Sequence, residues 1–322
     1  MLKNTVPKLI LAASVAVMVG FGITPAVAQE PQEPLTVILD WFVNPDHGPI
    51  FVAEHLGYFR DAGLAVEIIA PADPNDPPKL VAAGRADLAI TYQPQLYMAV
   101  AEGLPLRRVA TLVATPLNSL VVLRDGPIQS IADLDGEKIG FSVGGFEDAL
   151  LGAMLERHGL DLDDVELVNV NFSLSPALIS GQVAAVIGAF RNFELNQMDI
   201  VDRPGRAFFV EEEGVPAYDE LILVANADRL DDPRLAKFVT ALERAVQYMI
   251  NHPDLGWQAF IADRPELDDE LNRRAWADTL PRFALRPAAL DRGRYERFGE
   301  FMMVRGLIPE VLPIDAYAVE LP

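Results

Sequence analysis

The feature that most constrains the fold is an alternation of short β-rich runs with helix-like segments. Residues 35–40, 64–70 and 86–91 form the β-rich runs, and residues 50–59 and 79–83 between them carry helical spacing of apolar side chains. Strand, helix and strand at these distances are typical of right-handed βαβ units. The sequence therefore predicts an α/β fold with a mostly parallel sheet flanked by helices.

A second series of the same kind follows after a strand-like run at residues 120–123. The chain then returns to a buried-strand pattern at residues 221–225 and is almost wholly helical from residue 232 onward. This order predicts two lobes joined by two crossings, near residues 123–124 and 220–224. The predicted lobes are residues 29–123 plus 225–322 for lobe 1 and residues 124–224 for lobe 2.

The N-terminal segment has the three parts of a secretory signal peptide. Lys3 and Lys8 give a positive start, residues 9–23 are mostly apolar, and Ala26-Val27-Ala28 supplies a small-x-small cleavage pattern. A membrane anchor is the alternative, but a spanning helix needs about 20 apolar residues and normally lacks such a site behind it. We therefore expect residues 1–28 to be removed and the protein to be exported.

Composition excludes several classes of function. The chain contains no cysteine, which excludes disulfides, thiolate metal sites, a cysteine nucleophile and a lipid-modified cysteine anchor. Export without that anchor predicts a protein that diffuses freely in a periplasm. The net charge of −21 makes nucleic-acid binding implausible. The four histidines lie in no zinc or hydrolase motif, so we expect no enzyme, no metal and no cofactor.

Polar and aromatic residues gather in loops that directly follow predicted strands. Ligands in open α/β sheets bind beyond the carboxyl ends of the strands, and with two facing lobes these ends line one cleft. We therefore predict a binding site for a small molecule there. The candidate residues are Asp40, Trp41, Asn44 and His47 after the first strand; Tyr92 and Gln93 after the third; Gly144, Gly145 and Phe146 in lobe 2; and Arg191, Asn192, Phe193 and Glu194 after a later strand.

The side chains themselves indicate a flat, polar ligand. Tyr92 can stack on a planar ring, and Gln93 offers both a donor and an acceptor. Glu194 is the leading recognition residue, because a ligand with two parallel N–H donors would satisfy a buried carboxylate bidentately. The alternatives are a surface ion pair between Arg191 and Glu194 and a core role for Trp41. The glycine pair resembles no complete phosphate motif.

The motif residues Trp41, Asn44, His47 and the following Phe51-Val52-Ala53, then Gly57-Tyr58-Phe59, resemble the signature of a known family. It is the thiamine-pyrimidine, NMT1/THI5-like family, which includes periplasmic proteins that bind formylaminopyrimidine and fungal pyrimidine synthases. The segments 81–90 and 133–140 resemble stretches shared with binders of aliphatic sulfonates and nitrate. The likeness runs from about residue 35 to residue 225.

The resemblance implies a two-lobed type II periplasmic-binding fold that delivers its ligand to the permease of an ABC importer. It also implies that Trp41, Tyr92 and Phe193 stack on a pyrimidine while Glu194 takes its ring nitrogen and amine. Two alternatives stay open: another ligand, such as a riboflavin-like heterocycle or a sulfonate- or nitrate-type anion, and a pyrimidine synthase. The synthases depend on a cysteine-rich motif, which this chain lacks, and on lysine-bound pyridoxal phosphate and a sacrificial histidine.

Overall fold

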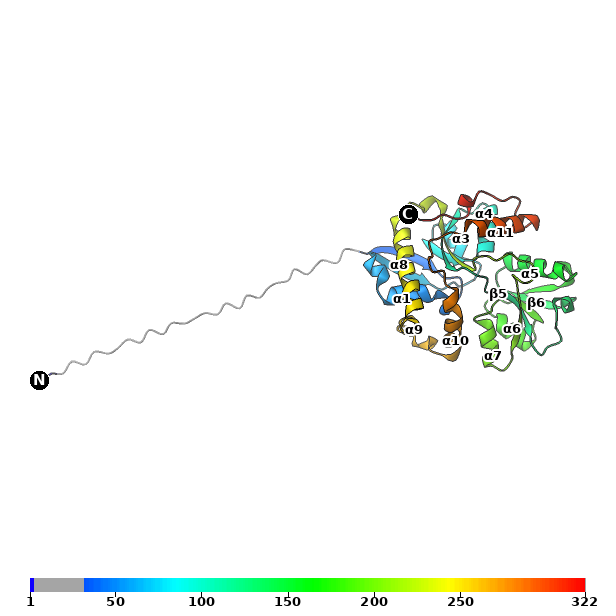
Figure 1. Ribbon diagram of the computed structural model, residues 1–322, viewed down its shortest axis with the longest axis horizontal. Coiled ribbons are helices and arrows are strands. Elements are labelled where there is room, and N and C mark those ends of the chain that lie inside the picture. The colour runs from blue at the N-terminus through cyan, green and yellow to red at the C-terminus, as the bar shows by residue number, and fades with distance from the viewer. Residues whose placement is uncertain (3–31, 322) are drawn as a thin grey trace. The chain divides into compact units, whose positions relative to one another are not determined.

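The computed structural model describes residues 1–2 and 32–321 (Figure 1). The predicted signal peptide, apart from its first two residues, lies outside the described residues. No helix in the described part is long and apolar enough to cross a membrane. The described residues 32–321 form one compact unit, and the account below concerns this unit alone.

The first of two five-stranded sheets has the strand order β2-β1-β3-β10-β4. Strand β1 pairs in parallel with β2 and with β3, whereas β10 runs antiparallel to both of its neighbours, β3 and β4. Four strands therefore share one direction. The strands are β1 (Glu33–Ile38), β2 (Leu64–Ile69), β3 (Leu88–Thr91), β4 (Leu106–Val113) and β10 (Leu221–Asn226).

The second sheet repeats this arrangement with the order β7-β6-β8-β5-β9. Strand β6 is parallel to β7 and β8, and β5 runs antiparallel to β8 and β9. The two sheets confirm the predicted two-lobed α/β fold with mainly parallel sheets. The strands are β5 (Asn118–Leu123), β6 (Lys138–Phe141), β7 (Glu166–Asn169), β8 (Ala185–Phe190) and β9 (Gly205–Phe209).

The chain crosses between the sheets at residues 114–117 and 210–220. Strand β5 pairs only within the second sheet, so the sheets change before residue 118, ahead of the crossing expected at residues 123–124. An apolar run such as 120–123 fits the buried centre of either sheet, so its pattern alone does not say which sheet it joins. The limits of the lobes as separate domains stay a prediction.

One buried carboxylate joins the two crossings. Glu220, at the end of the second crossing, accepts hydrogen bonds through Oε2 from the backbone N–H groups of Leu117 (2.6 Å) and Asn118 (2.9 Å). The hydroxyl of Tyr218 donates to the same oxygen at 3.0 Å. Burial raises the pKa of Glu220 to about 7, although these three bonds act in the opposite direction.

Helices cover both sheets (Figure 1). The helix expected over residues 50–59 is divided at Gly57, which has a φ of +75° and ends the first segment in the left-handed conformation that glycine favours. The helices are α1 (Gly48–His55), α2 (Tyr58–Asp61), α3 (Pro77–Ala82), α4 (Gln93–Ala101), α5 (Phe146–Arg157), α6 (Leu174–Ser180), α7 (Glu194–Ile200), α8 (Pro233–Asn251), α9 (Pro253–Ile261), α10 (Glu270–Thr279) and α11 (Arg292–Val304).

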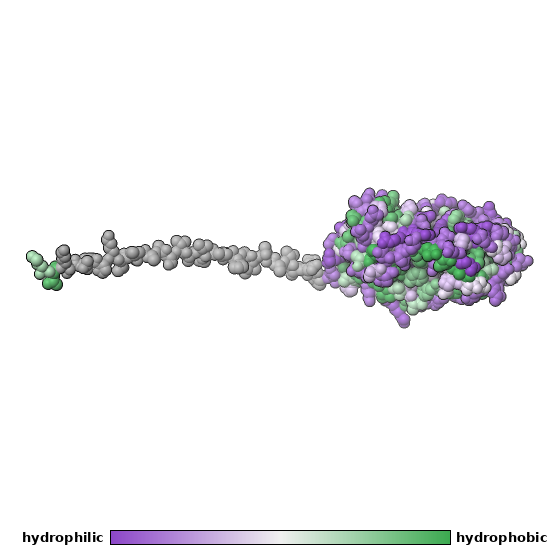
Figure 2. Space-filling view, turned by 90° about the horizontal axis from the view of Figure 1, so that it is seen from below, coloured by the Kyte–Doolittle hydropathy of each residue, from purple (hydrophilic) through white to green (hydrophobic). Residues whose placement is uncertain are grey.

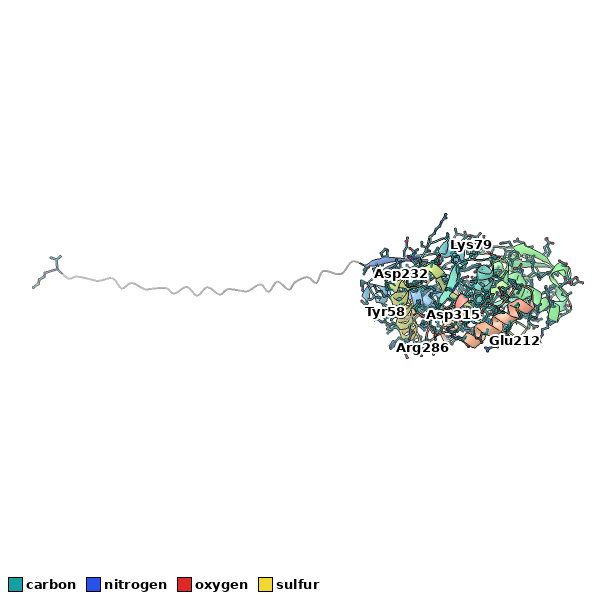
Figure 3. The ribbon with its side chains drawn as sticks, turned by 90° about the horizontal axis from the view of Figure 1, so that it is seen from above. Tyr58, Lys79, Glu212, Asp232, Arg286 and Asp315 are labelled. Atoms are coloured by element: carbon teal, nitrogen blue, oxygen red, sulfur yellow. The ribbon has the colours of Figure 1, made fainter. Side chains whose placement is uncertain are left out.

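Helix α8 shows how the tail completes lobe 1. Its apolar residues recur on one face, so Leu235, Phe238, Leu242 and Val246 are buried while the opposite face is polar. Phe238 stacks on Phe59 with ring centroids 4.8 Å apart. The surface visible in Figure 2 is mostly hydrophilic, and charged side chains such as Lys79, Glu212 and Asp315 project from the outside (Figure 3).

Candidate ligand-binding site

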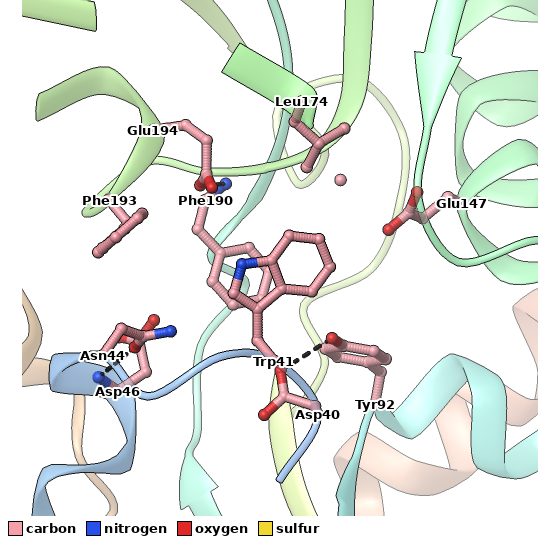
Figure 4. Close-up of a pocket in the computed structure, with 11 residues that line it drawn as sticks. Asp40, Trp41, Asn44, Asp46, Tyr92, Glu147, Leu174, Phe190, Phe193 and Glu194 are labelled. Carbon is pink, nitrogen blue, oxygen red and sulfur yellow. Dashed lines mark hydrogen bonds between the residues drawn. The ribbon is translucent and has the colours of Figure 1, made fainter. Parts of the chain in front are cut away.

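A narrow pocket lies where the loops of the two sheets meet (Figure 4). The loops that line it follow β1 and β3 of the first sheet and β6, β7 and β8 of the second, as the rule for α/β sheets requires. The lining residues are Asp40, Trp41, Asn44, Asp46, Tyr92, Glu147, Leu174, Gly188, Phe190, Phe193 and Glu194.

Asp40 is held by partners within lobe 1. The Tyr92 hydroxyl donates to its Oδ2 at 2.8 Å, and His47 Nε2 lies 2.9 Å from its Oδ1. Because Nδ1 of His47 accepts the backbone N–H of Asn44 at 3.3 Å, the imidazole proton is on Nε2 and is donated to Asp40. Both oxygens of this buried carboxylate therefore have a donor, and the side chain forms a fixed part of the wall.

Aromatic rings from both lobes surround the pocket. Tyr92 stacks on Phe146, with centroids 4.9 Å apart and 29° between the planes, and meets Phe190 edge-on at 6.4 Å. Burial and the nearby Asp40 carboxylate raise the pKa of Tyr92, which keeps its hydroxyl a neutral donor. Trp41 of lobe 1 packs edge-on against Phe172 of lobe 2 at 4.6 Å. Rings of the two lobes thus touch at the pocket.

Glu194 is the first residue of α7 and is buried. The backbone N–H of Phe190 donates to its Oε2 at 2.7 Å. Burial raises the pKa of Glu194 to about 8, and the carboxylate of Asp46 acts in the same direction. Its side chain points into the pocket in Figure 4, and no other residue in the described part of the chain forms a hydrogen bond to Oε1.

Glu147, which we did not predict as a ligand-binding residue, is held in the same way as Glu194. Its Oε2 accepts the backbone N–H groups of Ser142 (2.8 Å) and Val143 (3.1 Å), and the side chain points toward Trp41 in Figure 4. Burial raises the pKa of Glu147 to about 8, and the Glu220 carboxylate contributes to the rise. Lobe 2 therefore presents two carboxyl groups, each anchored through one oxygen.

Asp46 links the lobes at one end of the pocket. Its Oδ1 accepts the Nδ2–H of Asn192 at 2.6 Å and the hydroxyl of Thr279 at 2.9 Å. Burial raises the pKa of Asp46 to about 6, which the hydrogen bonds from Thr279 and Asn192 partly offset. Asn44 in turn accepts the backbone N–H of Asp46 at 2.8 Å, so the loop after β1 is fixed from both sides.

The structure brings six of the thirteen predicted residues into the pocket wall and places the others nearby or elsewhere. Asp40, Trp41, Asn44, Tyr92, Phe193 and Glu194 line it. His47, Phe146 and Asn192 contact lining residues from behind. Whether any of these residues binds a ligand stays a prediction.

Gln93, Gly144, Gly145 and Arg191 have other surroundings. Gln93 Oε1 accepts the backbone N–H of Asp219, and the two glycines line a separate hollow beside Asn75. Arg191 forms a two-pronged ion pair with Glu211, at 2.6 and 2.8 Å, and donates to the carbonyl of Leu117. The carboxylate partner of Arg191 is thus Glu211, and the alternative pairing with Glu194 is not formed.

Five lining residues were missed: Asp46, Glu147, Leu174, Gly188 and Phe190. Each lies at or within eight residues of a strand's carboxyl end, which is the signal that could have identified them. Gly188 has a φ of +93°, a conformation that side chains other than glycine rarely adopt. Among residues 32–321, no group of three or more His, Asp or Glu side chains could hold a metal ion.

Comparison with known proteins gives the family. The model described as NMT1/THI5 like matches residues 44–255, which is more than half of the chain. The chain belongs to the NMT1/THI5-like family. A putative thiamine biosynthesis protein of Haemophilus influenzae is 56% identical over 90% of this chain and 93% of its own length. The resemblance inferred from the motif around Trp41 and His47 is therefore confirmed.

Members of this family differ in function. The formylaminopyrimidine-binding protein of Halalkalibacterium halodurans is 32% identical over 78% of this chain and 77% of its own length. A 4-amino-5-hydroxymethyl-2-methylpyrimidine phosphate synthase of Legionella pneumophila is 26% identical over 82% and 85%. The family therefore includes proteins named as binders and proteins named as enzymes.

Solved structures confirm the expected fold. The periplasmic aliphatic sulphonate binding protein of Escherichia coli superimposes with a TM-score of 0.66, at 14% sequence identity, over 90% of this chain and 93% of its own. At this sequence identity the match supports a shared architecture and nothing more. The chain thus has the two-lobed fold of the periplasmic substrate-binding proteins.

Proposed function

We propose that this protein is the periplasmic substrate-binding component of an ABC importer and that its ligand is a thiamine-precursor pyrimidine of the formylaminopyrimidine type. The signal-peptide pattern of residues 1–28 supports export, and the fold supports delivery to a permease. The relative from Halalkalibacterium halodurans is named for binding such a ligand. Within the pocket, Trp41, Tyr92 and Phe193 would contact the ring faces and edges.

The observation that carries the proposal is the pocket-facing carboxyl of Glu194. It is buried, Phe190 anchors it through one oxygen, and no other residue in the described part of the chain forms a hydrogen bond to its other oxygen. An aminopyrimidine presents an amine donor beside a ring-nitrogen acceptor. A protonated carboxyl matches this edge, because its carbonyl oxygen accepts from the amine while its O–H donates to the ring nitrogen. Such pairing buries no net charge.

Isothermal titration calorimetry tests the proposal directly. We expect formylaminopyrimidine to bind the mature protein with a Kd below about 1 µM, a binding free energy beyond about −8 kcal/mol. Glu194→Ala should weaken binding by about 10- to 100-fold, because it removes hydrogen bonds made in a site closed to water. Glu166→Ala, an exposed glutamate of the same lobe, is the matched control. Absence of binding by the wild type would refute the assignment.

An anionic ligand is disfavoured by the charge of the pocket. Four of its lining residues are acidic, and no lysine, arginine or histidine stands among the residues that line it in the described part of the chain. An anion buried here would lack a counter-charge and meet like charges, which is costly. We expect alkanesulfonates and nitrate to leave the melting temperature unchanged in a thermal-shift screen, whereas a bound heterocycle would raise it.

A pyrimidine synthase is the second candidate, supported by the named enzymes among the relatives. The residues here do not fit lysine-bound pyridoxal phosphate. Lys79, Lys138 and Lys237 are surface residues paired with Asp76, Glu166 and Glu33, and none lines the pocket. His47, at the family's histidine position, is fully buried behind Asp40. Incubation with pyridoxal phosphate should therefore produce no Schiff-base absorbance.

A further inference from the structure

The loop before α5 holds the side chain of Glu147 in place. The carboxyl turns back from the first turn of the helix, and its Oε2 takes the N–H groups of Ser142 and Val143, the two residues that follow β6. A carboxyl oxygen has two lone pairs for such bonds. Oε2 therefore already accepts two hydrogen bonds within the protein.

The carboxyl group lies against Gly188, which lines the pocket with it. A Cβ at residue 188 would lie only 2.4 Å from Oε1 and 2.7 Å from Oε2 of Glu147, and the φ of +93° there is one that other side chains rarely adopt. Glycine thus leaves room for the whole carboxyl group beside the cavity. No residue among 32–321 forms a hydrogen bond to this oxygen, although the side chain is 3% exposed.

Resting on the proposed function, we propose that Glu147 binds the ligand as a neutral carboxylic acid, donating its Oε1–H to an acceptor on the edge remote from Glu194. In Figure 4, Glu194 and Glu147 lie on opposite sides of the Trp41 ring. The ligand class is therefore a planar heterocycle with an amino-bearing edge for Glu194 and an acceptor, such as the carbonyl oxygen of a side arm, for Glu147.

The position of the proton follows from the contacts. Because backbone N–H groups occupy Oε2, a protonated Glu147 carries its hydrogen on Oε1, which faces the pocket. Burial raises the pKa of Glu147 to about 8, so the acid form predominates at pH 7. The titratable groups that act on it are Glu220 and Asp148, and its own carboxylate acts on the Tyr92 phenol.

The test compares two ligands rather than two absolute affinities. Formylaminopyrimidine carries a carbonyl on its side arm, whereas 4-amino-2,5-dimethylpyrimidine has the same amino edge and no such acceptor. Groups that act on the shared ring, such as Glu194 and Asp46, affect both ligands alike and cancel in the ratio of the two Kd values. At pH 7 we expect the wild type to prefer the formyl compound by about 3- to 10-fold, the effect of one neutral hydrogen bond.

Two variants assign the preference to Glu147. In Glu147→Gln, the amide oxygen can hold Ser142 and Val143 while its NH₂ donates into the pocket, so the preference should persist at pH 7 and at pH 9. The wild type should lose it at pH 9, where Glu147 is ionised and Oε1 can only accept. Glu147→Ala should lose it at both values. Glu166→Gln is the matched surface control.

The outcomes separate the two proposals. Equal binding of both ligands by the wild type at pH 7 would overturn the role of Glu147 and leave the pyrimidine assignment standing. Loss of the preference in Glu147→Gln, or its persistence in the wild type at pH 9, would also overturn that role. Binding of neither ligand to the wild type would overturn the proposed function and this inference with it. If Glu147→Ala fails to fold, the glutamine variant and the pH series decide.

Discussion

The two lobes contribute walls of different chemical character to the same pocket. On the lobe 1 side, Asp40 and Asn44 have their hydrogen-bonding groups engaged by His47, Tyr92 and the loop backbone. On the lobe 2 side, Glu147 and Glu194 are each anchored through one oxygen, and the other oxygen is free to bind. Lobe 1 therefore supplies a preformed surface, while lobe 2 supplies unused hydrogen-bonding capacity.

This difference suggests a division of labour. A group already satisfied by the protein contributes shape and rigidity, and substituting it costs stability. A buried group left partly unsatisfied costs stability in the free protein, and a ligand that completes its bonds recovers that cost. We expect substitutions in lobe 1 to act mainly on folding and substitutions in lobe 2 to act mainly on affinity.

The largest effect should come from breaking the lobe 1 network. Asp40→Asn replaces a carboxylate that accepts two hydrogen bonds with an amide that can accept only through its oxygen, so either Tyr92 or His47 loses its acceptor. We expect the free energy of unfolding, measured by urea denaturation, to fall by about 2–3 kcal/mol. Asp125→Asn makes the same change at an exposed position, and an equal cost for the two would contradict the prediction.

Cutting the link between the walls should have an intermediate effect. Asn192→Ala removes the donor that connects lobe 2 to Asp46, with a loss of about 1–2 kcal/mol from the closed arrangement. Stopped-flow dissociation should then be about 5- to 20-fold faster, because opening no longer breaks this bond. Asn196→Ala, which cuts the exposed contact with Asp278 (2.8 Å), should have a smaller effect. An equal effect of the two would argue against a buried link.

The lobe 2 carboxyls should make the unliganded protein less stable as the pH rises. Burial raises the pKa of Glu147 and Glu194 to about 8, above the ordinary value of 4.5, so the folded state holds more protons than the unfolded state between these values. The free energy of unfolding must therefore decrease from about pH 5 to pH 8. Glu147→Gln should raise stability at pH 8 by on the order of 1 kcal/mol relative to wild type.

Chemical denaturation at pH 5 and pH 8 measures this effect, since the advantage of the glutamine variant should disappear at pH 5. An advantage of the same size at both values would mean that it has another cause than ionisation. Asp40→Asn should not share this dependence, because its cost arises from lost hydrogen bonds. The pH dependence of the free energy of unfolding thus distinguishes the lobe 2 wall from the lobe 1 wall a second time.

The smallest effect should come from an ion pair that joins the lobes at the surface. Glu156 of α5 lies 2.7 Å from Arg305, which follows α11, but the glutamate side chain is 62% exposed. Glu156→Gln should change ligand affinity by less than about twofold, because exposed pairs contribute at most about 1 kcal/mol and usually less. A tenfold loss measured by calorimetry would show that surface charge, and not the pocket, governs closure.

The sequence predicted the strands and helices that carry a clear period. The α8 segment has the bounds 233–251 in both the prediction and the structure, because a helix with one apolar stripe and an Asp-Pro start is a strong signal. Strand β4 was missed. It contains Arg107 and Arg108, and Arg108 is fully buried because its guanidinium binds the carbonyls of Pro287, Ala288 and Ala289. A partner 180 residues away leaves no local pattern.

The same limit applies to the site. The loops after the strands could be located, since topology fixes which strand ends meet. The direction of each side chain could not, because it depends on hydrogen bonds between distant segments. Arg191 turns toward Glu211 and Leu117, and Glu147 turns into the pocket because Gly188 leaves space for it. Neither contact can be inferred from the order of the residues in the sequence.

The carboxylate of Glu220 has a consequence for how the lobes can move. Oε2 of Glu220 accepts hydrogen bonds from Leu117 and Asn118 of one connecting segment and from Tyr218 of the other. A torsional change in either segment therefore strains the hydrogen bonds to the other segment. We therefore expect the two connections to move together. Pairs of spin labels placed on opposite lobes would then report two narrow distance populations, and cutting this tie with Glu220→Ala would merge them into one broad distribution.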